Sequence, residues 1–240
     1  MQKILTIFVL IVLSTSLFAQ DEKLKNFRFG LKFVPSLYWV SPDNTKDFKS
    51  SGSKVKFSYG LITDFKLNKT LFLSTGVEIN YTSFGINFEA PTYYLSAKDT
   101  FNLGSRAYNA TYIDIPITLK MKTPEIGYIT YFGQFGLDFS VRAKAKADDK
   151  GTLSNTVTIA ELSGVNITAD TNPLKLALNI GGGLEYNVAG STSLLVHINY
   201  HNGFTNILKK ESGLLYNSDN KRIEQNATLN YISLSLGVLF

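Results

Sequence analysis

Cysteine is absent from the 240-residue chain, which excludes disulfide bonds and thiolate metal sites. Outside the N-terminal segment, no apolar run approaches the ~18 residues of a transmembrane helix, so a helical membrane protein is excluded. The 24 basic residues outnumber the 19 acidic ones, but they are scattered and do not interleave with aromatics, so we expect no nucleic-acid partner. Proline is scarce, at 6 residues, whereas 18 glycines and 13% aromatics favour strands with tight bends.

The N-terminal segment has the pattern of a secretory signal. A positively charged start precedes an apolar run at residues 4–13, and a small residue, Ala19, stands before Gln20. The run of about ten residues is too short for a transmembrane helix. We therefore predict a signal peptide at residues 1–19, cleaved between Ala19 and Gln20, and a mature domain at residues 20–240. The alternative is a buried N-terminal strand or helix.

The last ten residues show the two-residue period of a β-strand. One face carries only apolar side chains, namely Ile232, Leu234, Leu236, Val238 and Phe240. Nine residues at ~3.3 Å each, tilted by ~40°, stand ~23 Å tall, close to the ~25 Å apolar band of an outer-membrane barrel. A barrel that closes in lipid leaves no strand edge exposed to aggregation.

Eight segments of the chain share this alternation and are joined by long and short connections in turn. They are residues 27–39, 55–67, 71–82, 112–121, 128–142, 174–187, 192–204 and 231–240. Short turns on one side and long loops on the other are typical of outer-membrane barrels. The pattern predicts an all-β fold: an eight-stranded antiparallel up-and-down transmembrane β-barrel with short periplasmic turns and long extracellular loops.

Three details of geometry follow from the pattern. The apolar positions of segments 55–67 and 71–82 are all odd-numbered, which requires a connection of three or five residues, or a bulge. Pro35 lacks a ladder donor, so we expect a bulge or local break there. Within the long loop 143–173, residues 156–160 and 165–169 suggest a small hairpin.

Alternation alone does not tell which face points inward, because a soluble lipocalin-like barrel also alternates. The polar face carries charges of both signs, which an interior of opposite-charge pairs explains. These predicted lumen charges are Arg28, Lys32, Asp64, Lys66, Glu78, Asp114, Lys120, Asp138 and Glu185, with Arg142 on the same face. Glycines also gather on this face, and aromatics gather near strand ends as interfacial girdles do. We therefore favour a barrel in the outer membrane of a Gram-negative envelope, with lipid against its apolar face.

Several stretches, taken in order, resemble the PorT-like outer-membrane β-barrel family. They are Phe18-Ala19-Gln20, Tyr112 to Ile117 (YIDIPI), Asn179 to Tyr186 (NIGGGLEY), Asn199 to Asn206 (NYHNGFTN) and Leu236 to Phe240 (LGVLF). The resemblance implies an eight-stranded barrel inserted by the barrel-assembly machinery. It also implies that Leu234, Leu236, Val238 and Phe240 form the signal that this machinery reads, although Val238 replaces an aromatic often found there. The family's namesake is associated with protein secretion, a role that we do not transfer to this chain.

Few residues suggest chemistry. His197 and His201 share a strand face, but four residues span ~13 Å, which is too far for one metal ion. We interpret them as hydrogen-bonded lumen residues; the alternative is a hydrolase site with His201, a loop serine and an aspartate. Gly181 to Gly183 lacks the Lys-Ser/Thr of a phosphate loop and lies in a strand. We predict no catalytic residue, no metal site and no cofactor.

Two classes of function remain open. The first is a structural or interaction barrel that offers its loops to a protein partner in the envelope or outside the cell. The second is a small channel or transporter, although eight strands leave an interior that side chains just fill. Loops 83–109 and 143–173 are the candidate contact regions because each is far longer than an ordinary hairpin loop. The first is rich in aromatics, so we expect the flanking strands to extend beyond the membrane as a ribbon, with these side chains packed on neighbouring loops or offered to a partner.

Overall fold

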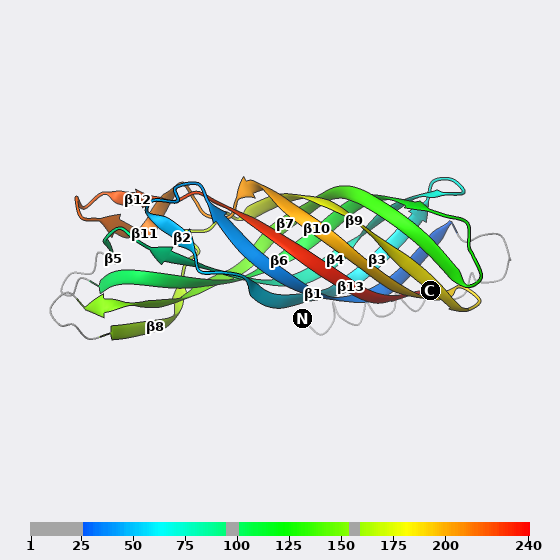
Figure 1. The fold of residues 1–240 in the computed structure, drawn as a ribbon, viewed down its shortest axis with the longest axis horizontal. Helices are drawn as coiled ribbons and strands as arrows, with labels where there is room; N and C mark the ends of the chain where they lie inside the picture. Colours follow the sequence, from blue (N-terminus) through cyan, green and yellow to red (C-terminus); the bar gives the residue numbers. More distant parts are fainter. Residues whose placement is uncertain (1–25, 95–100, 154–158) are drawn as a thin grey trace, which may run out of the picture.

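The computed structural model describes residues 26–94, 101–153 and 159–240, and it is an elongated barrel with strands along its whole length (Figure 1). The predicted signal peptide and its Ala19–Gln20 cleavage site lie outside the described residues. None of the described residues belongs to a helix long and apolar enough to cross a membrane.

Eight long antiparallel strands close into a ring. They are β1 (Phe27–Pro42), β3 (Lys54–Lys66), β4 (Leu71–Phe88), β6 (Phe101–Lys122), β7 (Ile129–Leu153), β9 (Leu174–Ala189), β10 (Thr192–Asn206) and β13 (Ala227–Leu239). Each strand pairs with its neighbours in this order, and β1 pairs with β13 to complete the ring. The predicted eight-stranded up-and-down barrel is confirmed.

Tight connections join the strands at one end of the barrel, which we call the turn end. Between β3 and β4, Lys66 pairs with Phe72 and the amide of Leu67 donates to the carbonyl of Leu71 at 2.9 Å, leaving three residues in the turn. This odd connection keeps both apolar faces outside and confirms that expectation. Of the two outcomes expected at Pro35, a bulge or a local break, the local break is found. The β1–β13 ladder is interrupted at Val34 and Pro35, with the same register on both sides. No bulge forms, because β1 keeps one register with β3 through Pro35.

Five shorter strands build the opposite end, which we call the loop end. They are β2 (Phe48–Ser50), β5 (Thr92–Tyr94), β8 (Ile159–Asn166), β11 (Glu211–Asn217) and β12 (Arg222–Glu224). β2 pairs with β4, β5 with β6 and β11, β8 with β7, and β11 with β12. Figure 1 shows these strands continuing the barrel outward beyond the eight-stranded ring.

The structure tests two expectations about the long loops. The extended ribbon is confirmed, since β4 and β6 stay paired out to Asn87 and Ser105. The expected hairpin at residues 156–160 and 165–169 is wrong, because its turn would fall inside β8. The β7–β8 ladder shifts register at Gly164, which adopts φ +70°. The glycine therefore forms a β-bulge within β8, and the strand continues to pair with β7 on both sides of it.

An apolar belt surrounds the half of the barrel nearest the turn end. Its side chains point outward and remain exposed, including Phe29, Leu31, Phe33, Leu61, Val77, Ile115, Ile117, Phe135, Phe139, Ile180, Leu194, Ile198, Leu234, Leu236 and Phe240. Val238 lies on the same face and is half-buried. A patch of this extent is stable against lipid rather than water. Whether the last strand also acts as an assembly signal stays a prediction.

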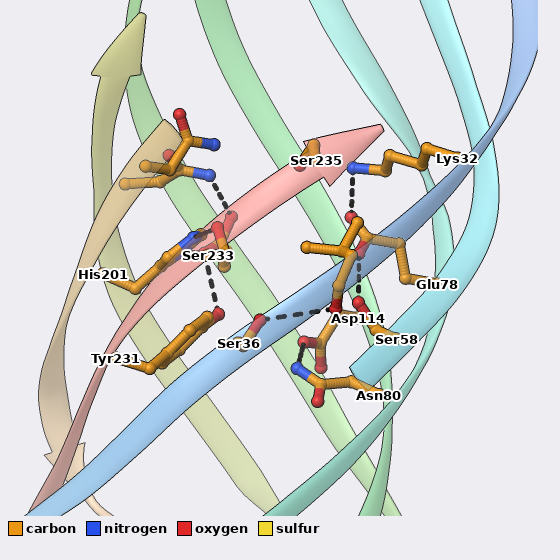
Figure 2. Close-up of a pocket in the computed structure, with 14 residues that line it drawn as sticks. Lys32, Ser36, Ser58, Glu78, Asn80, Asp114, His201, Tyr231, Ser233 and Ser235 are labelled. Carbon is orange, nitrogen blue, oxygen red and sulfur yellow. Dashed lines mark hydrogen bonds and ion pairs between the residues drawn. The ribbon is translucent and has the colours of Figure 1, made fainter. Parts of the chain in front are cut away.

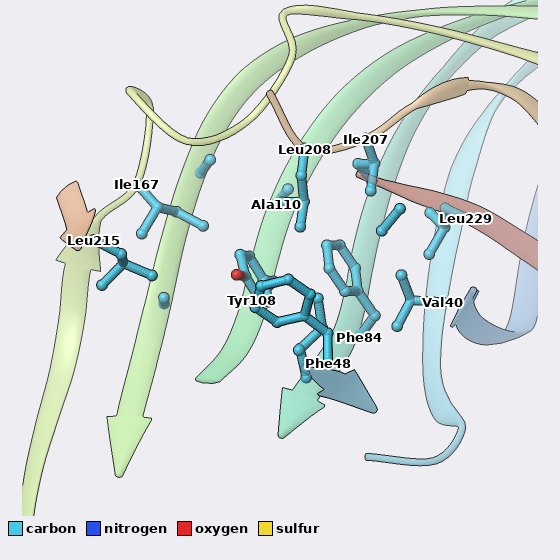
Figure 3. Packing of buried hydrophobic residues seen from close by; sticks show 14 of the residues in the cluster. Val40, Phe48, Phe84, Tyr108, Ala110, Ile167, Ile207, Leu208, Leu215 and Leu229 are labelled. Carbon is cyan, nitrogen blue, oxygen red and sulfur yellow. The ribbon is translucent and has the colours of Figure 1, made fainter. Parts of the chain in front are cut away.

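The barrel interior changes character along its axis. On β4, Ser74, Glu78 and Asn80 are buried in the belt half, whereas Phe84 and Ile86 are buried further along the same inward face. The β4–β6 register is unbroken through this point, so the face stays the same and only its chemistry reverses. Figure 3 shows the resulting core of the loop end, in which Phe84 stacks on Tyr108 at 4.6 Å beside Leu208. We call this part, with its apolar core and its short strands, the cap.

Candidate functional site

The predicted lumen charges lie on the inward side of the belt half, mostly in ion pairs. Near the turn end, the ammonium of Lys120 is 2.9 Å from Asp64, and Arg28 is 2.7 Å from Glu185. Lys122, a residue that the sequence analysis passed over, bridges Asp64 at 3.2 Å and Glu185 at 2.6 Å. Lys122 is two residues after Lys120 and therefore lies on the same face of the strand. This spacing is the sequence feature by which Lys122 could have been predicted.

A second group of charges lies nearer the middle of the barrel. Lys32 pairs with Glu78, and Lys175, also overlooked, lies 3.9 Å from Asp114. Asp138 lies beside His201, and Arg142 is half-buried and bonds to the hydroxyl of Thr171 at 2.5 Å. Lys66 is half-buried at the turn end and joins none of the ion pairs of the described chain. Buried charges are tolerated only when paired, so this lumen is a closed set of mutually compensating groups.

Among the described residues of the lumen, His201 has the one set of contacts that resembles a catalytic site (Figure 2). Its Nδ1 is 2.6 Å from Asp138, its Nε2 is 2.8 Å from the hydroxyl of Ser233, and its ring stacks on Tyr231 at 3.9 Å. These contacts have the order of a Ser-His-Asp triad. The serine comes from β13 and not from a loop, as the alternative in the sequence analysis assumed.

The surroundings of this triad do not suit catalysis. Ser233 is buried, and the adjoining cavity has about 20 Å³, room for about one water molecule and not for a substrate. A nucleophile needs a place beside it for the reacting atom, and none is formed here. His197 is also buried, with Gln134 and Asn199 as its polar neighbours. Among the described residues, no cluster of three or more His, Asp or Glu side chains could hold a metal ion.

The cap contains a second buried polar centre, organised by Arg106 of β6. The guanidinium makes two bonds to Asp149 of β7, at 2.7 and 2.9 Å, and a third to Asp170 at 2.9 Å. The hydroxyl of Tyr94, from β5, contacts both Arg106 and Asp149. Arg106, Asp149 and Asp170 are all fully buried.

Asp170 extends this network to the last long loop. It accepts from the hydroxyl of Ser212 at 2.9 Å and from the amide of Gly213 at 2.7 Å, and both donors belong to β11. The network around this guanidinium therefore joins five segments of the chain: β5, β6, β7, the loop that carries Asp170, and β11. Charge-assisted bonds of this kind are shorter and stronger than neutral ones, so they hold the loops in one arrangement.

The electrostatics of the cap reflect its dry interior. Burial would lower the pKa of Arg106, but Tyr108 and Asp149 outweigh that effect and hold the pKa above its usual range. Burial raises the pKa of the Tyr108 hydroxyl well above its usual value, and it does the same for Tyr94. The cap is therefore held together by a permanently charged arginine among neutral tyrosines.

A groove of about 600 Å³ lies at the far tip of the cap. It is lined by the loop after β1, the β4–β5 connection and the β11–β12 hairpin, with charges of both signs from Asp47, Asp219, Lys221, Arg222 and Glu224. Its volume is in the range of ordinary ligand sites, and polar groups converge on it. Sequence reasoning selected loops 83–109 and 143–173 but missed this contribution from the last loop, whose residues are distant in the chain.

Comparisons with known proteins agree with this architecture. A family model described as "Outer membrane protein beta-barrel domain" matches residues 18–209, and the chain belongs to that family. It is an outer-membrane β-barrel protein. The comparison with curated proteins gave no match.

Similar solved structures include the attachment invasion locus protein Ail of Yersinia pestis, at 14% identity and TM-score 0.37, covering 89% of this chain and 98% of Ail. Neisserial surface protein A has 15% identity and TM-score 0.41, with 88% and 95% covered. OprG of Pseudomonas aeruginosa has 10% identity and TM-score 0.43, with 89% and 95% covered. These likenesses are too distant to support an argument about function.

Proposed function

We propose that this protein is an interaction barrel, in which the belt half anchors a structured cap that binds a protein partner in the envelope or outside the cell. One observation carries the proposal: the long loops fold into a cap with its own apolar core and a fully buried Arg106 network. Loops that serve only as linkers do not bury so much of their own chain.

The groove at the tip of the cap is the proposed contact site. Its opposite charges suit a polar segment of a protein partner, and the fixed hairpin and loops around it lower the ordering entropy lost on binding. The lumen supports the same choice over a channel, because paired charges and packed side chains leave a central cavity of about 20 Å³. No residue of the proposed contact site performs catalysis.

Three further assignments complete the proposal. The stretches shared with the PorT-like family support membership of that narrower group. Residues 1–19 act as a signal peptide removed between Ala19 and Gln20. The barrel-assembly machinery inserts the chain by reading its terminal strand, whose outward face includes Leu234, Leu236 and Phe240.

The test compares two charge-reversal variants by cross-linking in intact outer membranes. Lys221→Glu with Arg222→Glu alters the groove, while Lys209→Glu with Lys210→Glu makes the same change of charge at exposed cap residues outside the groove lining. We expect the first variant to lose a cross-linked partner that the wild type and the second variant keep. Equal capture by all three, or stable ion-selective steps in planar bilayers, would contradict the proposal.

A further inference from the structure

A basic groove lies on the outer wall of the barrel, just beyond the apolar belt. It has a volume of about 190 Å³ and is lined by Lys56, Lys144 and Lys146 together with Tyr81, Asn109 and Thr111. Tyr81, Thr111 and Lys144 lie side by side on β4, β6 and β7, because Tyr81 pairs with Thr111 and Thr111 with Lys144. Asn109 and Lys146 form the next outward-facing pair along the same strands.

The groove owes its shape to a gap in the strand pairing. β3 pairs with β4 only from Ser58, opposite Asn80, onward, and the first residues of β3 pair with β1 alone. Lys56 lies in this unpaired stretch, half-buried on the inward face of β3, and it reaches the groove beside Tyr81. The β6–β7 ladder shifts register between Thr111 and Tyr112 of β6. Before the shift, β7 presents apolar residues such as Phe139 outward; after it, β7 presents Lys144 and Lys146.

The three lysines are not neutralised by neighbours. None of them takes part in the ion pairs found among the described residues. Asp148, the nearest acidic residue on the outward face of β7, is bonded instead to Asn109 at 3.1 Å and to the amide of Gly164 at 2.9 Å. Lys144 and Lys146, two residues apart on one strand face, have Cα atoms about 6.6 Å apart, so both ammonium groups can reach one anion.

The position of the groove indicates its ligand. Tyr81 packs against Phe57 at 5.3 Å and Tyr59 at 6.3 Å, and both of these belong to the exposed aromatic rim of the belt. Aromatic rims mark the depth of lipid headgroups, so the lysines lie where the headgroups of the loop-side leaflet begin. We propose that Lys56, Lys144 and Lys146 bind the phosphate of a lipid headgroup whose acyl chains lie along the belt.

The test uses full-length protein in a zwitterionic detergent and counts bound lipids by native mass spectrometry. Phosphatidic acid is the probe, with phosphatidylcholine of the same acyl chains and inorganic phosphate as separate arms. For Lys144→Gln with Lys146→Gln, we expect phosphatidic acid to bind roughly thirtyfold more weakly, from about 1 kcal/mol per lysine near an anionic surface and 1.4 kcal/mol per tenfold change. Phosphatidylcholine binding should not change.

Matched variants keep this test decisive. Lys209→Gln with Lys210→Gln removes the same charge from the cap and should bind phosphatidic acid as the wild type does. Lys144→Arg with Lys146→Arg should restore binding, and a gel-mobility assay for folded barrel confirms that each variant folds. Equal binding by the wild type and the Lys144/Lys146 glutamine variant, or an equal loss in the Lys209/Lys210 variant, would overturn the proposal. Inorganic phosphate binding as tightly as phosphatidic acid would overturn the assignment to lipid.

Discussion

The belt half and the cap are made of the same strands but have opposite polarity. In the belt half, β7 exposes Phe135 and Phe139 and buries Asp138; in the cap, it exposes Lys146 and buries Ala145. The ladder between β6 and β7 continues through both regions, with a register shift between Thr111 and Tyr112 after which the odd-numbered residues of β7 face inward in place of the even-numbered ones. The solvent outside each region explains the reversal, since lipid favours apolar side chains facing outward, whereas water favours burying them.

The two regions also use charge differently. The belt half distributes its buried ions over several pairs, such as Lys120 with Asp64 and Arg28 with Glu185. The cap concentrates its buried charge on Arg106, which joins β5, β6, β7 and β11 through Asp149, Asp170 and Tyr94. The cap should therefore unfold as a unit when its centre is removed, while the belt half should tolerate the loss of any one of its pairs better.

The largest expected effect comes from Arg106→Met. The substitution leaves Asp149 and Asp170 buried without a cation, and breaking a buried ion pair in this way costs about 3–5 kcal/mol. Hydrogen exchange should show loss of protection in the cap and retained protection in the belt half. Lys150→Met is the control, because its ion pair with Glu161 is exposed and should matter little. Uniform loss of protection along the barrel would show that the two regions are not separate units.

Phe84→Ala should have a nearly equal effect. Phe84 is 1% exposed and stacks on Tyr108 in the cap core, so truncation leaves a cavity and costs about 3–5 kcal/mol. Phe57→Ala removes the same side chain from the outer face of the belt, where Phe57 is 43% exposed. A smaller loss is expected there, and denaturant refolding in lipid vesicles measures both. Equal losses would mean that the cap core contributes nothing beyond ordinary surface packing.

The polarity reversal predicts unequal responses to the same substitution at two sites on one strand face. Leu234→Arg places a cation against lipid and should destabilise the barrel by about 2–4 kcal/mol. Thr228→Arg lies on the same outward face of β13 but beyond the belt, and should change stability by less than about 0.5 kcal/mol. Similar results for Leu234→Arg and Thr228→Arg in a refolding assay would place the lipid boundary elsewhere.

The two-residue period was enough to predict the ring of eight strands, because apolar lipid-facing residues alternate with polar lumen-facing residues along every strand of such a barrel. The cap was harder to predict for a physical reason. Phe84 and Ile86 break the outward apolar pattern of Val77 and Ile79, and sequence alone does not distinguish a shifted register from a change of solvent. The Arg106 network was missed because its partners come from segments far apart in the chain, and no local pattern connects Arg106 with Asp170.

The smallest expected effect is a response of the cap to alkaline pH. Burial raises the pKa of Tyr108 and Tyr94 in the folded cap, whereas an exposed tyrosine titrates near pH 10. The folded state then holds these protons more tightly than the unfolded state, so the stabilisation is complete below about pH 10 and declines as the pH rises further. Limited proteolysis of the cap in detergent should therefore show constant protection from pH 7 to 9 and faster cleavage near pH 11. Tyr108→Phe removes one titrating hydroxyl and should reduce this acceleration, while Tyr128→Phe, exposed at the turn end, should leave it unchanged. Cleavage that accelerates equally in all three proteins would show that the buried tyrosines do not control the alkaline opening of the cap.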